Sequence, residues 1–112
     1  SLTFKYLKIA FSLKELESSG LIDYLTNKFI QIVLFGSIAK GEDDINSDVD
    51  LVCIGLKKEL DLFEFSKKLK KEINVHFFNP AQWKKQKQEN KAFYQDVIST
   101  GINLIGEMPI VE

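Results

Sequence analysis

The sequence predicts a small α/β (α+β) domain in which helices pack against a small mixed β-sheet. Three short apolar runs, at residues 29–35, 48–55 and 74–79, have the length of strands and are bounded by glycine, proline or polar residues. The segments between them carry apolar residues at helical spacing. With 112 residues, 45% of them hydrophobic and 28% charged, the chain has the size and composition of one globular domain with a modest core.

The N-terminal part predicts a helical leader over residues 1–28, followed by the domain proper over residues 29–112. Ser12 is the expected N-cap of the leader helix, because Glu15 stands at the capping-box position three residues later. Gly20 is the expected end of this helix, since glycine readily takes the left-handed conformation that closes helices. The leader is expected to be too slight to fold alone.

The first strand, residues 29–35, is almost continuously apolar and is therefore expected to be covered on both faces. It breaks sharply at Gly36 and Ser37, which open what reads as a helical turn. Backbone N–H groups at the start of such a turn have no partner within the helix and suit phosphate oxygens. The break therefore predicts a phosphate-binding turn.

The second strand begins with two carboxylates. Because side chains alternate along a strand, Asp48 and Asp50 point to one face while Val49 and Leu51 point to the other. Two neighbouring carboxylates repel each other unless a cation lies between them, and hard oxygen ligands favour Mg²⁺ or Mn²⁺. A phosphate-binding turn beside paired carboxylates predicts a nucleotide site.

The rest of the chain completes the predicted domain. The expected elements are a helix over 59–72 with Leu60, Phe63, Leu69 and Ile73 inward, a strand over 74–79, a helix opening at Pro80, a helix over 89–100 and an extended segment over 102–105. The single cysteine, Cys53, excludes a disulfide within the chain and is expected to be buried. Trp83 is expected to anchor the core or an interface, with base stacking as the alternative.

Several charged groups have an ordinary explanation. Asp43 and Asp44 are expected to be solvated loop charges rather than metal ligands. The lysines that could form a nucleic-acid patch are expected instead to be a solvated helix face; they are Lys67, Lys68, Lys70 and Lys71. A net charge of −1 argues against direct nucleic-acid binding through bulk electrostatics.

The chain carries no sign of a membrane protein. It has neither an apolar run of the roughly 20 residues that span a membrane nor a signal-peptide pattern. The expected location is therefore the cytoplasm.

The central motif resembles a known family. Gly36-Ser37, ten further residues and then Asp48-Val49-Asp50, within the stretch LFGSIAKGEDDINSDVDLV, resemble the signature of the DNA polymerase β-like nucleotidyltransferases, most closely their minimal nucleotidyltransferase branch. The resemblance implies that fold, a nucleoside triphosphate substrate such as ATP, and Mg²⁺ or Mn²⁺ as cofactor. The implied reaction transfers a nucleoside monophosphate to an acceptor hydroxyl of a protein or a nucleic acid.

The resemblance also implies roles for individual residues. Asp48 and Asp50 would be catalytic and would hold two magnesium ions. The implied nucleotide-binding residues are Gly36, Ser37, Lys40 and Ser47. Ser37 would bind the β- and γ-phosphates, and Ser47 would cap or steady the loop that leads into Asp48. Lys40 would neutralise phosphate charge, or is simply a solvated surface lysine; the sequence leaves both alternatives open.

The chain departs from the family pattern at one place. Complete members carry a third carboxylate on a later strand, which corresponds to residues 74–78 here. One alignment puts His76 at that position and another puts Asn74 there, and neither is an acid. Imidazole is a poor magnesium ligand but accepts a proton near neutral pH, so His76 is a candidate catalytic residue. The alternative is a histidine that only makes hydrogen bonds beside the carboxylates.

Three functions remain open at this stage. The first is an active nucleotidyltransferase, which in the minimal branch often acts as the antitoxin beside a small helical toxin. The second is a catalytically degenerate, nucleotide-binding regulatory module fused to a DNA-binding domain, because residues 1–28 are similar to the linker after such a domain in some relatives. The third is an interaction partner without a ligand, such as a homodimer, which the paired acids argue against.

Overall fold

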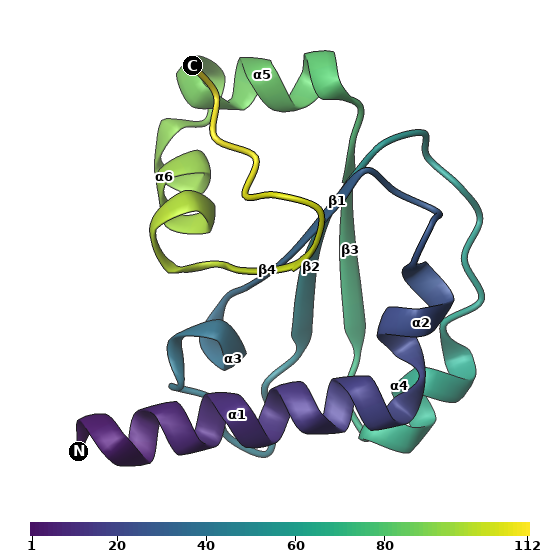
Figure 1. Cartoon of the computed structure of the whole chain (residues 1–112), viewed down its shortest axis with the longest axis vertical. Helices are drawn as coiled ribbons and strands as arrows, with labels where there is room; N and C mark the ends of the chain where they lie inside the picture. Colours follow the sequence, from purple (N-terminus) through teal and green to yellow (C-terminus); the bar gives the residue numbers. More distant parts are fainter.

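A computed structural model describes residues 1–112, and its centre is a four-stranded sheet with the strand order β3-β2-β1-β4 (Figure 1). Strands β1 and β2 are antiparallel, β1 and β4 are antiparallel, and β2 and β3 are parallel. The elements are α1 (Leu2–Ser19), α2 (Leu21–Leu25), β1 (Gln31–Phe35), α3 (Ser37–Lys40), β2 (Val49–Ile54), α4 (Phe63–Leu69), β3 (Ile73–Phe78), α5 (Pro80–Glu89), α6 (Lys91–Thr100) and β4 (Ile102–Ile105). The predicted α+β fold with a mixed sheet is confirmed.

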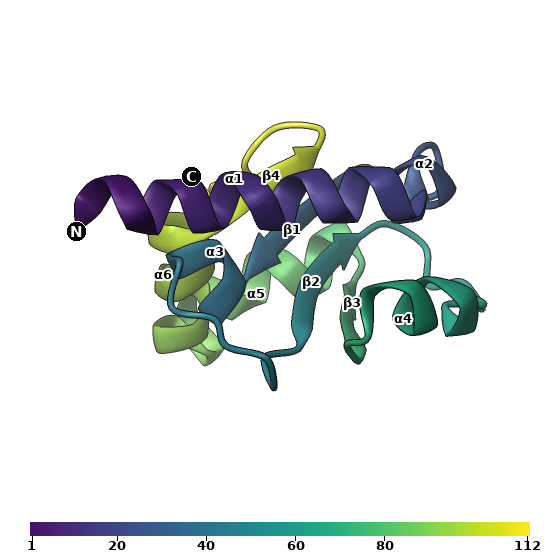
Figure 2. The same ribbon diagram turned by 90° about the horizontal axis from the view of Figure 1, so that it is seen from below.

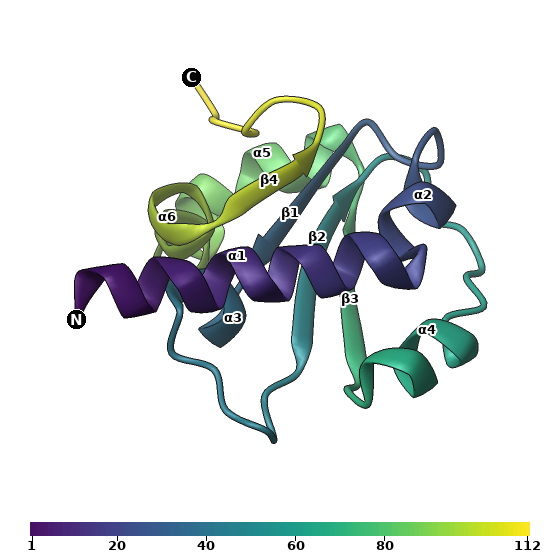
Figure 3. The ribbon, with the colours of Figure 1, turned by 60° about the horizontal axis from the view of Figure 1, so that its bottom comes forward.

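Helices cover both faces of the sheet, as the apolar strands predict. On one face, Leu34, Leu51 and Cys53 share a core with residues of α1, α2 and α3. On the other face, Val33 and Val52 share a second core with α5 and α6. Figures 2 and 3 show α1 running across one side of the sheet while α5 and α6 lie on the other. The two central strands are therefore buried from both sides.

The leader helix is longer than its sequence predicts. Helix α1 begins after Ser1, whose side chain accepts a hydrogen bond from the Phe4 N–H, so the predicted start at Ser12 is wrong. The buried residues of α1 are Ile9, Ser12, Leu16 and Ser19. These residues are three or four positions apart and therefore lie on one face of the helix. Because two of the four are serines, the pattern of apolar residues alone does not predict this buried face. Gly20 ends the helix with φ 88°, as expected.

The leader packs into the main core. Leu16, Leu21 and Leu25 are at most 2% exposed and belong to the same buried cluster as the inner residues of β1 and β2. Residues 1–28 and 29–112 thus share one hydrophobic core. The division of the chain at residue 28 stays a prediction.

The predicted helix over residues 59–72 is too long, because only its central part forms a helix, α4 (Phe63–Leu69). The Asp61 carboxylate accepts a hydrogen bond from the Phe63 N–H, at 3.3 Å, and such a local turn competes with the first turn of a helix. Lys70 has φ 55°, a left-handed conformation that ends α4. Phe63, expected inward, is 60% exposed.

The C-terminal helices form close to their predicted places. A reciprocal capping box of Asn79 and Gln82 starts α5, with Pro80 in its first turn. Helix α6 begins at Lys91 rather than at residue 89. No helix of the chain combines the length and the apolar character that crossing a bilayer requires.

Candidate functional site

The site residues meet at one end of the sheet. Because β1 and β2 are antiparallel, the end of β1 lies beside the start of β2, and Phe35 pairs with Asp50. Because β2 and β3 are parallel, their starts also lie together, and Asp50 pairs with Asn74. The site-forming ends of three strands therefore lie together at one end of the sheet, next to α3 (Figure 1).

Gly36 brings the turn after β1 against the carboxylates. Its φ of 81° lies in the region that favours glycine, and a Cβ at this position would lie 2.6 Å from the Asp50 Oδ2. A side chain at residue 36 would therefore collide with the Asp50 carboxylate. The absence of a side chain lets the backbone of the turn and the acid occupy adjacent space.

Ser37 stands directly after this glycine, at the first position of α3, and is half-buried. The first N–H groups of a helix have no partner within the helix. The turn and the acids thus lie side by side, as the sequence motif predicts.

The two carboxylates are held by one amide group. Asn74 Nδ2 donates a hydrogen bond to Asp48 Oδ2 and another to Asp50 Oδ1, each at 3.1 Å. All three residues are half-buried. Because the two N–H bonds of the amide point to different acids, Asn74 offsets part of the repulsion between them.

The structure places Asn74 rather than His76 in contact with the acids. His76 lies two residues further along β3, where it pairs with Val52. Its exposed ring packs edge-on against Phe35, with 5.3 Å between ring centroids, and near Phe93 at 5.9 Å. The sequence left both alignments open, because it does not reveal the register between β2 and β3.

Lys40 is engaged by a residue that the sequence analysis missed. Its Nζ lies 3.0 Å from Asp96 Oδ1, which links α3 to α6. The hydrogen bond and the charge of Asp96 raise the pKa of Lys40 above its usual value. Lys40 is therefore an ion-paired lysine at the rim of the site, and no local sequence signal connects it to a residue on α6.

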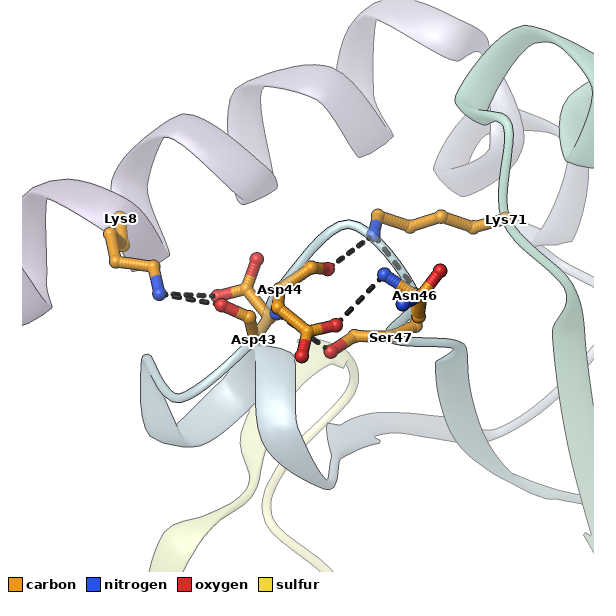
Figure 4. Close-up of polar contacts among 6 residues, drawn as sticks. All are labelled: Lys8, Asp43, Asp44, Asn46, Ser47 and Lys71. Carbon is orange, nitrogen blue, oxygen red and sulfur yellow. Dashed lines mark hydrogen bonds and ion pairs between the residues drawn. The ribbon is translucent and has the colours of Figure 1, made fainter.

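The loop between α3 and β2 is tied down from two sides (Figure 4). Lys8 of α1 donates to the Asp43 carbonyl oxygen at 2.6 Å and lies 3.6 Å from the Asp43 carboxylate. Lys71 donates to the carbonyl oxygens of Asp44 and Ser47, at 3.2 and 3.1 Å. The Asp43 side chain is only 14% exposed, so its prediction as a solvated charge is wrong. Lys71 likewise holds the loop rather than lying free on a helix face.

Ser47 steadies this loop from within. Its hydroxyl accepts a hydrogen bond from the Asp44 N–H at 2.9 Å, and the Asp44 carboxylate accepts one from the Asn46 N–H at 2.8 Å (Figure 4). Such local bonds fix polar loops that lack regular structure. Ser47 therefore orders the segment that leads into Asp48, and a direct role in nucleotide binding stays a prediction.

Two other singled-out residues lie in the core. Trp83 is 4% exposed, and its Nε1 donates to the Pro109 carbonyl oxygen at 2.7 Å, so its ring is a buried anchor. Cys53 is fully buried, and this burial raises the pKa of its thiol to about 12. Both side chains are therefore enclosed by the core.

The residues at the site fit a divalent cation held by two acids and an amide. Asp48 Oδ2 and Asp50 Oδ1 both lie 3.1 Å from the amide nitrogen of Asn74, so the three side chains meet at one place. Carboxylate and amide oxygens are the ligands that hard cations prefer. The chain contains no group of three or more acidic, histidine or cysteine side chains placed to hold a metal ion. The donor set thus differs from a three-carboxylate centre.

The sequence over most of the chain is that of a nucleotidyltransferase domain. The sequence model of the family described as "Polymerase beta, Nucleotidyltransferase" matches residues 20–109. The chain belongs to this family, as the motif from Gly36 to Asp50 predicts.

Two solved structures resemble the chain at low identity. One is a crystal structure of a mutant toxin–antitoxin pair, MntA–HpeT, with 18% identity and a TM-score of 0.49. The other is a crystal structure of a toxin–antitoxin with AMP-PNP, with 20% identity and a TM-score of 0.46. Each similarity covers 88% of this chain and 73% of the other. A search of curated proteins found no significant match.

Proposed function

We propose that the chain binds a nucleoside triphosphate, ATP in the first place, together with Mg²⁺ or Mn²⁺, and transfers the nucleoside monophosphate to an acceptor hydroxyl of a protein or a nucleic acid. The observation that carries this proposal is the contact between the Gly36 turn and Asp50, where only a missing Cβ leaves room for the carboxylate. The proposed phosphate-binding turn at Gly36 and the proposed cation ligand Asp50 are therefore adjacent, as binding of a metal–triphosphate complex requires.

The proposed division of labour follows from the positions of the residues. Asp48 and Asp50, whose carboxylate oxygens both contact the Asn74 amide, would hold the divalent ion. The backbone at Gly36 and the Ser37 hydroxyl bind and orient the β- and γ-phosphates. When bound, the ion lowers the pKa of the acceptor hydroxyl and offsets negative charge on the departing pyrophosphate.

Lys40 is proposed as a phosphate ligand that pairs with Asp96 as long as no nucleotide is bound. The ion pair with Asp96 keeps the ammonium group at the end of α3, one helical turn from Ser37. A triphosphate would compete with Asp96 for this charge. Ser47 contributes indirectly, through the ordered loop before Asp48.

His76 is proposed as the proton acceptor for the attacking hydroxyl. Its ring is exposed and lies on the same face of the sheet as Asp50 and Asn74, because their strands pair in register. Contacts with Phe35 and Phe93 fix the orientation of the imidazole. A positioned imidazole is a common general base in enzymes.

A second candidate function is nucleotide binding without turnover, as a regulatory module fused to a DNA-binding domain. The observation that favours it is the amide of Asn74, a neutral group in contact with both acids, at one of the two positions where the family resemblance allows a third carboxylate. Such a module would keep the affinity for metal and nucleotide that the turn and the two acids supply.

A protein partner is the remaining part of the proposal, namely a small helical toxin or a second copy of the chain. Its support is a stripe of exposed apolar side chains on α1 at helical spacing: Phe4, Leu7 and Phe11, each more than 60% exposed. Single exposed apolar residues are common, but an apolar row on one helix is typical of contact surfaces. A triphosphate substrate and this partner would both be met in the cytoplasm.

The test combines labelling with binding. The chain is incubated with each α-³²P-labelled nucleoside triphosphate, Mg²⁺ or Mn²⁺, and a cell lysate, beside the double variant Asp48→Asn/Asp50→Asn. The matched control is Asp23→Asn/Glu59→Gln, which removes the same charge from exposed positions of the surface. A labelled protein or RNA that the control produces and the acid variant does not would establish the transferase and its acceptor.

Calorimetry separates the two candidate functions. Mg²⁺-dependent ATP binding without any labelled product, lost in the acid variant alone, would favour the regulatory module. We expect the acid variant to fold as well as the parent, because it relieves repulsion between like charges. Unchanged ATP and metal affinity in the folded acid variant would refute the site. A complex of the chain with a toxin-like helical protein, lost in Leu7→Glu but not in Lys14→Glu, would support the proposed partner.

A further inference from the structure

Asn74 is the one neutral group between the two acids, and only its nitrogen is engaged. The structure gives Nδ2 two hydrogen bonds, to Asp48 Oδ2 and Asp50 Oδ1, and gives the amide oxygen none. The residue is half-buried near the start of the edge strand β3. The amide therefore lies beside the two carboxylate oxygens that would bind a bridging cation.

This orientation of the amide is incompatible with a bound cation. The two N–H groups point at the same carboxylate oxygens that would coordinate the ion, so the ion would face partial positive charge. The terminal torsion of asparagine is broad and roughly two-fold, so a half-turn exchanges nitrogen and oxygen without moving the backbone. After that half-turn the amide presents an oxygen ligand of the kind that hard cations accept.

The charge at the site limits how many ions it can hold. Asp48 and Asp50 carry two negative charges and Asn74 adds none, so one divalent ion neutralises the site. No third acidic, histidine or cysteine side chain joins them in a metal-binding group. A second ion would lack a counter-charge until the phosphates of a nucleotide supply one.

We propose that Asn74 is a positioning residue with two states. Its amide nitrogen holds Asp48 and Asp50 together when the site contains no ion, and its amide oxygen replaces the nitrogen as a third ligand when a divalent ion binds. In the absence of nucleotide the chain then binds one divalent ion, and the amide nitrogen and oxygen exchange places when the ion binds. This inference rests on the metal site of the proposed function.

The experiment counts Mn²⁺ ions bound to the nucleotide-free chain by electron paramagnetic resonance. The wild type is expected to bind one ion. Asn74→Leu keeps the size of the side chain but has no oxygen, and should bind Mn²⁺ at least tenfold more weakly. Asn74→Asp should bind it at least tenfold more tightly. The charge-matched control Asn27→Asp, exposed in the turn before β1 where φ is 70°, should leave the affinity unchanged.

Two further measurements report on the amide itself. In EDTA, Asn74→Asp should melt at a lower temperature than wild type, because three acids then repel each other, and Mn²⁺ should reverse the order. In wild type, Mg²⁺ should shift the pair of side-chain NH₂ resonances that is missing from the NMR spectrum of Asn74→Leu. The resonances of the other asparagines should stay in place.

Different outcomes overturn different claims. If Asn74→Leu binds Mn²⁺ as tightly as wild type while Asp50→Asn binds none, the amide oxygen is not a ligand and this inference fails, but the proposed metal site stands. If wild type and Asp50→Asn are alike in binding no ion, the metal site of the proposed function fails as well. If Asn74→Asp does not fold, Asn74→Leu and the wild-type NH₂ resonances still decide.

Discussion

Strands β2 and β3 run side by side in parallel, yet they contribute to the site in different ways. Strand β2 lies inside the sheet, and Leu51, Val52 and Cys53 have no exposed surface. Strand β3 is an edge strand, and all its residues are half-buried or exposed. The register pairs Asp50 of the buried strand with Asn74 of the edge strand.

This difference separates a rigid half of the site from an adjustable half. Asp50 lies in a strand that is packed on both faces and Asp48 directly precedes this strand, so the core holds both acids in place. Asn74 and His76 sit on a strand with one free edge, where side chains change at little cost to packing. We therefore expect the acids and the Gly36 turn to be required for binding metal and nucleotide, while β3 adjusts metal affinity through Asn74 and turnover through His76.

The largest expected difference between the strands is in thiol reactivity. Burial raises the pKa of Cys53 to about 12 from a reference value of 9.0, which lowers the thiolate fraction about a thousandfold. A thiol reagent at pH 8 should label Cys53 at least that much more slowly than a free thiol. A cysteine placed on β3 by Val75→Cys, in a Cys53→Ala chain, should react far faster. Equal rates would show that β3 is as buried as β2.

The same pKa shift has a consequence for stability. The unfolded chain ionises Cys53 from about pH 9 upward while the folded chain keeps the thiol protonated. The free energy of unfolding should therefore fall as the pH rises from 9 to 12, and Cys53→Ala should remove that part of the fall. Chemical denaturation at several pH values measures it.

The next expected effect concerns turnover. If His76 accepts the proton of the attacking hydroxyl, His76→Gln should lower kcat by about a hundredfold and leave nucleotide affinity nearly unchanged. The ring contacts of His76 with Phe35 and Phe93 are the competing explanation for its place. His76→Phe keeps such contacts, so full activity in that variant would reduce His76 to a packing residue.

A smaller effect compares the packing of the two strands directly. Val52→Ala on β2 should lower the free energy of unfolding by roughly 2–3 kcal/mol, because it leaves a cavity in a closed core. Val75→Ala on β3 removes the same atoms from a half-buried position and should cost about 1 kcal/mol or less. Urea denaturation of both variants gives the two values, and similar costs would contradict the division into a rigid and an adjustable half.

The smallest expected effect lies outside both strands. Lys40 and Asp96 form a partly exposed ion pair, so breaking it should change stability by less than about 1 kcal/mol. If Asp96 and the triphosphate compete for the Lys40 ammonium group, Asp96→Asn should tighten ATP binding a few-fold. Lys40→Met should weaken it a few-fold. Calorimetric affinities that do not differ between these variants would leave Lys40 as a surface lysine.

The contrast between β2 and β3 also explains what the sequence could predict. The sheet, the Gly36 turn and the burial of Cys53 follow from patterns within a few residues of one another. The contact partner of the acids does not, because Asn74 meets them only through the register of two strands separated by α4. The sequence therefore left two candidates, Asn74 and His76, for the residue of β3 that contacts the acids.

The wrong predictions for Asp43 and Ser12 have the same cause, namely contacts with elements far away in the sequence. Asp43 looked solvated because its partner, Lys8, lies on α1, far away in the sequence. Ser12 looked like a cap because a serine is seldom part of a buried helix face, yet here it packs in one. Local polarity thus predicts exposure well only where no distant element covers the segment.

The order of the strands has a consequence for how the chain folds. Strand β1 pairs with β2, which follows it closely, but its other edge pairs with β4, where Leu34 meets Ile102. During synthesis at the ribosome, β1, β2 and β3 emerge long before β4, so one side of β1 stays uncovered for most of that time. An open apolar edge attracts other chains as readily as its own partner. Pairing with β4, which is made after the other three strands, therefore closes an edge of β1 that could otherwise bind another chain.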